Sequence, residues 1–203
     1  MSLNDKYISF ATVFIALIAL IVSMKSCQQS EQALQLQTKE HINAITTVWK
    51  SEVQKEKDLI KIIPTNDKIT LQKAIVHFPD KISNNHWPVE SPDYMLHLIY
   101  YKSTIQQFIE SRIPKKKGSV AILDSSIPII IDSQYIVNGQ LYSDRALYAL
   151  EINAIVWSEE YKAPSITYNG ISFIRRLDET EYPKILLNNL LNTVSKNMQK
   201  DKN

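Results

Sequence analysis

The sequence has only three glycines in 203 residues, at positions 118, 139 and 170. Phosphate-binding loops of the G-x-G-x-x-G and Walker types need several glycines within one turn, because backbone N–H groups must approach the phosphates closely. These three glycines are each more than twenty residues apart. Their spacing therefore excludes most nucleotide-dependent enzymes.

Cysteine is almost absent as well. Cys27 is the single cysteine, so the chain can form neither an intrachain disulfide nor a zinc site built from several thiolates. Cys27 follows an apolar stretch, where S-acylation and an unmodified thiol both remain open. The sequence predicts no cofactor.

The net charge is small: 23 basic residues oppose 21 acidic ones and leave a charge of +2. Arginine is scarce within that total and occurs at Arg112, Arg145, Arg175 and Arg176. Proteins that read nucleic acid rely on a basic field and on the bidentate fork of arginine. We therefore expect no nucleic-acid partner.

What the chain does contain is one long apolar run. Residues 7–24 carry no charge and, as a helix, would be about 27 Å long, against roughly 30 Å for the hydrocarbon core of a bilayer. Lys6 and Lys25 bracket the run. A cleaved signal peptide has a shorter apolar core, and Lys25 disfavours lipoprotein processing before Cys27. We predict an uncleaved transmembrane anchor at 7–24, preceded by a flank at 1–6.

Orientation follows from the basic residues at each end of the anchor. Lys25 and Lys39 follow it, whereas Lys6 and the α-amino group precede it. The positive-inside rule weakly favours a cytoplasmic C-terminal domain. The expected location is a membrane crossed once, the inner or plasma membrane of a bacterium.

Residues 25–63 are predicted to form a stalk helix. The stretch 28–63 contains no proline or glycine, and its second half places apolar residues mostly three and four positions apart. This stripe consists of Ile42, Ile45, Trp49, Val53, Ile60 and Ile63. It would pack on the globular domain or on a second copy of the stalk.

Residues 64–203 are predicted to form the globular domain. Its expected helices are a short one over 67–78 and a longer one that starts at Ser91-Pro92-Asp93 and runs to Arg112. Serine is a favoured N-cap, proline suits the first helical position, and an early acid complements the helix dipole.

The second half of this domain is predicted to be a meander closed by a helix. Residues 127–137 and 147–157 are rich in β-branched and aromatic residues, typical of strands. Asn138-Gly139 opens their connection, which a longer loop through Asp144 and Arg145 completes. Asn169-Gly170 predicts a type I′ hairpin, and 181–200 a final helix. The predicted fold class is α+β.

Candidate site residues are few and scattered. The four histidines occur singly, and His97 has the best claim to a role because tyrosines flank it. Asp132 and Glu151 would share a sheet face near Arg175 or Arg176, where solvated cross-strand pairs are the simpler interpretation. Lys115-Lys116-Lys117 would attract an anionic lipid surface or form a solvated loop. We assign no catalytic, cofactor-binding or metal-binding residue.

The expected function is that of a tethered interaction or accessory domain without catalytic activity, whose partners are the lipid bilayer and an unidentified protein. Bacterial accessory, phage-exclusion and immunity-type factors are among the roles considered. The alternatives are a membrane-bound hydrolase with an unrecognised site and an extracytoplasmic sensory or ligand-binding domain.

Overall fold

The computed structural model describes Leu20, Ile42 and residues 22–38, 45–113, 118–159, 161–178 and 180–200; for 196–200 it describes the backbone alone. The chain divides into two compact units, Met1–Thr46 and Thr47–Asn203.

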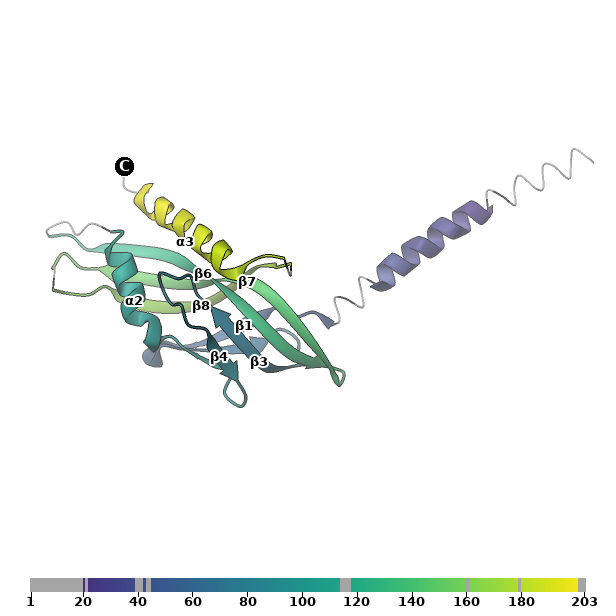
Figure 1. Ribbon diagram of the computed structural model, residues 1–203, viewed down its shortest axis with the longest axis horizontal. Coiled ribbons are helices and arrows are strands. Elements are labelled where there is room, and N and C mark those ends of the chain that lie inside the picture. The colour runs from purple at the N-terminus through teal and green to yellow at the C-terminus, as the bar shows by residue number, and fades with distance from the viewer. Residues whose placement is uncertain are drawn as a thin grey trace, which may run out of the picture. The chain divides into compact units, whose positions relative to one another are not determined.

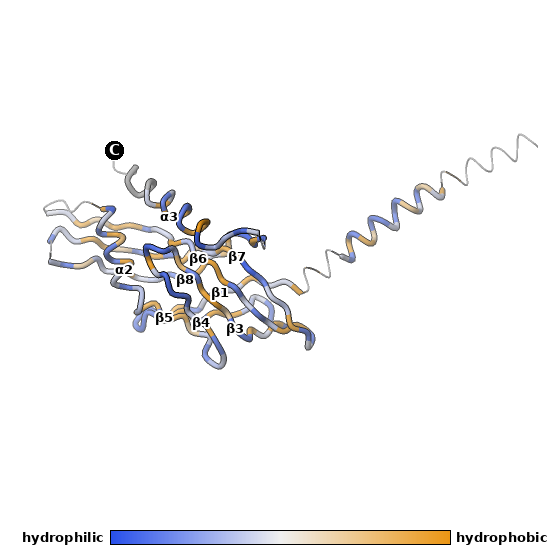
Figure 2. Tube along the Cα trace, in the orientation of Figure 1, coloured by the Kyte–Doolittle hydropathy of each residue, from blue (hydrophilic) through white to orange (hydrophobic). Residues whose placement is uncertain are grey.

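The first unit is helical wherever it is described up to Ile45. Residues 22–38 are mostly hydrophilic (Figure 2), and the side chains of Leu34 and Leu36 are exposed. Within the described residues, no helix is both long and apolar enough to span a membrane. Most of the predicted anchor at 7–24 lies outside those residues, so the anchor stays a prediction.

The second unit consists of antiparallel strands and two α-helices (Figure 1). In chain order its elements are β1 (Trp49–Gln54), the 3₁₀ turn η1 (Lys55–Lys57), β2 (Leu59–Pro64), β3 (Ile69–His77), β4 (Trp87–Glu90), β5 (Met95–His97), α2 (Ile99–Glu110), β6 (Ala121–Val137), β7 (Gln140–Val156), β8 (Ser165–Arg176) and α3 (Pro183–Lys200). One sheet has the strand order β1-β2-β5 and the other β4-β3-β6-β7-β8. The α+β class and the closing helix are confirmed.

The prediction that a stalk helix continues to residue 63 is wrong. Trp49–Gln54 and Leu59–Pro64 form an antiparallel hairpin, in which Val53 pairs with Ile60. Glu56 and Lys57, which interrupt the predicted apolar stripe, lie in the turn. The hairpin buries Trp49, Ile60 and Ile62 in the core, and this tertiary burial outweighs the helix propensity of the lysines and glutamates. The compact unit accordingly begins at Thr47 rather than at 64.

Two further helix predictions are corrected. Residues 69–77 are strand β3, in which a bulge between Leu71 and Lys73 breaks the period of two and hides the strand pattern. Ser91 and Pro92 do not cap a helix but lie in a turn before β5, and α2 begins only at Ile99. Five strands therefore precede α2 in this unit, where the sequence predicted helices, while further strands and the closing helix follow α2 as predicted.

The two predicted long strands are confirmed and extend further, as β6 and β7. Asn138 and Gly139 form the complete turn between them, because Val137 pairs directly with Gln140. The predicted longer loop through Asp144 and Arg145 is wrong, since both residues lie within β7. This tight turn fixes the register of both strands over their full length.

The prediction of a hairpin at Asn169-Gly170 is also wrong. Both residues lie inside β8, where Asn169 is the extra residue of a bulge between the pairs Glu151–Gly170 and Ile152–Tyr168. Gly170 has φ +127°, a conformation that side chains rarely adopt. The bulge brings β8 close to β1, where Ser51 Oγ accepts a hydrogen bond from Ile171 N at 2.9 Å.

The core lies between the two sheets. Alternate residues of β6 point into it, and from Ile127 onward all six of them are buried: Ile127, Ile129, Ile131, Ser133, Tyr135 and Val137. Trp49 of the smaller sheet packs edge-on against Tyr135, and α2 adds Tyr101, Ile105, Phe108 and Ile109 to the same core. The opposite face of β6 and β7 carries α3, where Ile130 and Leu147 pack with Leu187. The larger sheet is thus covered on one face throughout and on the other in part.

Candidate functional site

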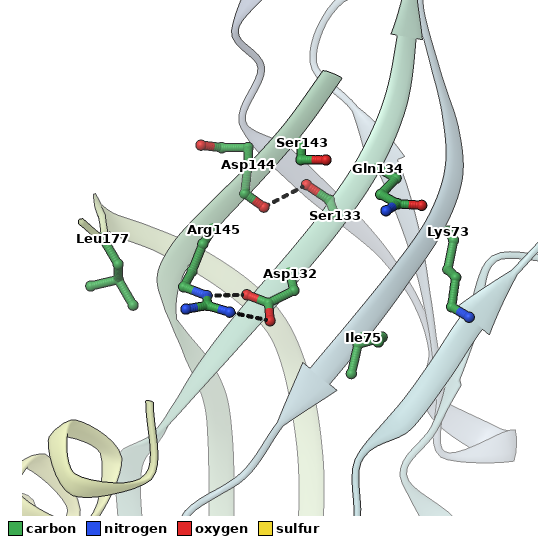
Figure 3. A pocket seen from close by; sticks show the side chains of 9 residues that line it. All are labelled: Lys73, Ile75, Asp132, Ser133, Gln134, Ser143, Asp144, Arg145 and Leu177. Carbon is green, nitrogen blue, oxygen red and sulfur yellow. Dashed lines mark hydrogen bonds and ion pairs between the residues drawn. The ribbon is translucent and has the colours of Figure 1, made fainter. Parts of the chain in front are cut away.

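A cleft of about 490 Å³ opens on the face of the larger sheet that also carries α3 (Figure 3). Period-two alternation places Asp132 and Gln134 on the same face as Ile130, which packs with α3. Lys73 and Ile75 of β3 line one side, Ser143 and Arg145 of β7 the other, and Leu177 closes one end. A volume of this size is typical of small-ligand and peptide side-chain sites.

Asp132 is the most strongly bound group in the cleft. Arg145 binds it with two hydrogen bonds, Nε to Oδ1 at 2.6 Å and one terminal nitrogen to Oδ2 at 2.9 Å. His77 Nε2 lies 3.0 Å from Oδ2. Because an ionised carboxylate can only accept, this nitrogen of His77 carries the hydrogen. Both oxygens of Asp132 are therefore engaged by neighbouring strands.

These contacts decide the protonation state of Asp132. Burial of the side chain disfavours its charge, but the hydrogen bonds from His77 and Arg145 and their charges outweigh it and lower the pKa of Asp132 to about 2. A carboxylate with so low a pKa is a poor proton acceptor near neutral pH, because a general base works best when its pKa is near the working pH. The geometry favours a structural ion pair over acid–base chemistry.

The rest of the cleft offers charge and hydrogen bonding at its rim. Lys73 Nζ forms an ion pair with Glu90 at 3.2 Å, and both side chains are about half exposed. Such exposed pairs contribute little stability, so Lys73 keeps most of its conformational freedom. Ser143 and Gln134 are exposed beside it. The cleft combines two cations, one fully engaged carboxylate and two neutral polar groups.

A second polar group lies on the opposite face of the same strands. Trp49 Nε1 donates to Ser133 Oγ at 3.1 Å, and Ser133 in turn donates to the backbone oxygen of Asp144. Arg176 links the Asp144 carboxylate at 3.3 Å to the backbone oxygen of Thr47 at 2.8 Å. Burial raises the pKa of Asp144, although Arg176 offsets part of the effect. This cluster fastens the start of the second unit to β6, β7 and β8.

The structure does not bring the sequence-predicted candidates together. Glu151 pairs with Ser126, six positions along β6 from Asp132. His97 lies in β5, opposite Leu59 and beside the ring of Tyr100, with 6.1 Å between ring centroids. Arg175 binds Glu181, and Lys115-Lys116-Lys117 lies outside the described residues.

Sequence reasoning missed His77, Lys73 and Arg145 as neighbours of Asp132. The position of Arg145 could have been predicted, because a two-residue turn at Asn138-Gly139 pairs Val137 with Gln140. Counting five positions away from the turn in both strands then pairs Asp132 with Arg145. His77 and Lys73 were hidden because β3 was taken for a helix.

Within the part of the chain that the structure describes, no three histidine, cysteine, aspartate or glutamate residues are placed to hold a metal ion. Comparisons with family models, with curated proteins and with solved structures found no match.

Proposed function

We propose that this chain is a single-pass, membrane-tethered interaction domain that acts without catalysis. The observation that supports this most directly is the state of Asp132, whose two oxygens are held by Arg145 and His77 and whose pKa is lowered to about 2. The most strongly bound polar groups of the cleft are thus engaged in their own ion pair. What remains at the rim is exposed side chains suited to recognition.

The tether is supported by the sequence. Residues 7–24 form an uncharged apolar run long enough to span a bilayer, and Lys25 and Lys39 favour a cytoplasmic position for the domain that follows. A tether of this kind raises the local concentration of the domain near a membrane partner without supplying any chemistry. An accessory role in a membrane system, including phage exclusion or immunity, is the biological setting that we propose.

Site-specific photo-crosslinking in native membranes tests this function. A photo-reactive phenylalanine derivative replaces one exposed residue at a time: Leu141, Tyr100 or Tyr182, with Lys68 as a polar control. We expect at least one of the three apolar positions to give a protein–protein adduct of discrete mass, and the Lys68 position to give none. Adducts with lipid alone at every position would contradict the proposal.

A further inference from the structure

One stretch of β7 has a hydrogen-bonding partner on one side only. β8 pairs with β7 as far as Ala146–Arg176, and Leu177 N then donates to Arg145 O at 2.9 Å. The chain turns away after Leu177, where Glu181 N bonds to Asp178 O. Among the strands that the structure describes, only β6 therefore pairs with residues 140–144 of β7.

The register shows which backbone groups face outward from this stretch. The closing pair of a two-residue turn is hydrogen-bonded, so Gln140, Tyr142 and Asp144 direct their backbone groups to β6. Leu141 and Ser143 then direct theirs to the open side, in agreement with the bond from Leu177 to Arg145 O. Both residues are exposed, Leu141 by 63%. Among the described residues, none forms a hydrogen bond to these outward groups.

The cleft lies directly beside this open edge, since Ser143, Asp144 and Arg145 line it. A strand added along residues 140–144 would cover about 17 Å, at about 3.4 Å per residue. Side chains of an added strand alternate between faces, so the residue next to Ser143 would enter the cleft together with Gln134 and Arg145.

The charge of the cleft indicates which side chain fits. Lys73 and Arg145 are the positive side chains that line the cleft on this face, and Asp132 and Glu90 are the negative ones beside them. Arg145 and His77 hold both oxygens of Asp132, whereas Lys73 has its ion pair with Glu90 outside the lining of the cleft. An incoming carboxylate would meet Lys73, whose present partner Glu90 is half exposed and weakly held. An incoming ammonium group would lie beside Lys73 and would find both oxygens of Asp132 already engaged.

We propose that the Leu141–Ser143 edge of β7 docks an extended segment of a partner protein, which adds as a strand and places an acidic side chain in the cleft. Strand addition uses backbone hydrogen bonds for affinity and a pocket for specificity, and both are present here. The inference rests on the proposed function, because it assigns the surface and the class of partner of the same interaction domain.

Two capped pentapeptides test the edge and the charge preference, TVEVT and its lysine counterpart TVKVT. The full chain in detergent micelles is titrated with each peptide while its backbone amides are followed by NMR. We expect TVEVT to give saturable shifts at Leu141 and Ser143 and to bind at least about fivefold more tightly than TVKVT. Absence of shifts at these two amides in the millimolar range would overturn the inference, as would equal affinity for the two peptides.

Variants separate the contributions of the edge and the cleft. Ser143→Pro removes an outward N–H without touching a bond to β6, and proline is tolerated where the N–H of an edge strand faces solvent. Loss of one such hydrogen bond should weaken the binding of TVEVT by about fivefold. Lys73→Glu should reverse the preference between the peptides, whereas Lys50→Glu, the same charge change on the exposed side of β1, should not. If Ser143→Pro does not fold, Leu141→Pro tests the edge in its place, and the two lysine variants test the charge preference.

The photo-crosslinking positions distinguish failure of this inference from failure of the proposed function. An adduct at Leu141 that disappears in Ser143→Pro and maps to an acidic segment of another protein supports strand addition. Adducts at Tyr100 or Tyr182, with none at Leu141, overturn the docking edge and leave the interaction domain standing. An adduct at Leu141 to a second copy of this chain would overturn the assigned class of partner.

Discussion

Gly170→Ala tests the contact that joins the two sheets of the second unit. A Cβ at this position would lie 2.6 Å from Ser51 Oγ, closer than real Cβ contacts allow, and the backbone has φ +127°. The unfavourable backbone conformation costs about 1–3 kcal/mol for a residue other than glycine. Displacing Ser51 Oγ also breaks its bond from Ile171 N, worth about 1 kcal/mol. We expect Gly170→Ala to lower the free energy of unfolding by about 2–4 kcal/mol.

A double-mutant cycle separates the two causes. Ser51→Ala removes the oxygen, and the nearest remaining atoms, Val53 Cγ2 at 3.6 Å and Ser51 Cβ at 3.8 Å, lie at ordinary distances from the added Cβ. In the double variant the backbone penalty stays, the clash with Ser51 Oγ is absent, and the hydrogen bond from Ile171 N, which each single variant loses, is lost only once. The double variant should therefore be more stable than the sum of the single effects by about 1 kcal/mol.

The assay is urea unfolding of the chain without residues 1–24, followed by tryptophan fluorescence and analysed by linear extrapolation. Trp49 lies in the same strand as Ser51 and is 2% exposed, so its fluorescence emission changes when β1 unfolds. Strictly additive effects of Ser51→Ala and Gly170→Ala, or a neutral Gly170→Ala, would refute the described approach of β1 to β8.

Two further predictions concern the ion pair and the domain boundary. Asp132→Asn should cost about 2 kcal/mol of unfolding free energy at pH 7, since a pKa lowered from 3.8 to about 2 in the folded state stabilises the charged form. That stability is present above about pH 4 and is lost as the pH falls toward about 2, so wild type and variant should converge there in pH-dependent denaturation, while Glu90→Gln changes little at any pH. A chain of residues 47–203 should unfold cooperatively in calorimetry, whereas residues 64–203, which lack β1 and most of β2, should not; a cooperative transition of the shorter chain would contradict the place of Trp49 in the core.

The sequence was most informative where one strand face is buried. In β6 the β-branched and aromatic residues of 127–137 predicted the strand, because such side chains fit a pleated surface with a buried face. The closing helix α3 was likewise predictable from its leucine stripe and the charges at its ends. Long elements in which the buried positions recur regularly can therefore be predicted from the sequence.

Short and irregular strands were not predictable in the same way. In β3 the bulge at Gln72 shifts the buried positions to 69, 71, 74 and 76, which no longer alternate regularly. In β1 and β2 the lysines and glutamates suit a helix, and only pairing with β5 and burial in the core select the strands. Lys73 and Ile75 of the cleft come from β3, so they could not be identified before the pairing of β3 with β6 was known.

Extraction of the full chain from native membranes at alkaline pH tests the central claim that a membrane anchor tethers a self-contained domain. The full chain should stay in the membrane pellet after carbonate washing, while the chain of residues 47–203 should be recovered in the supernatant. We expect this partition because residues 7–24 are an uncharged run long enough to span the bilayer. Release of the full chain by carbonate, or recovery of a soluble form that begins near residue 25, would contradict it.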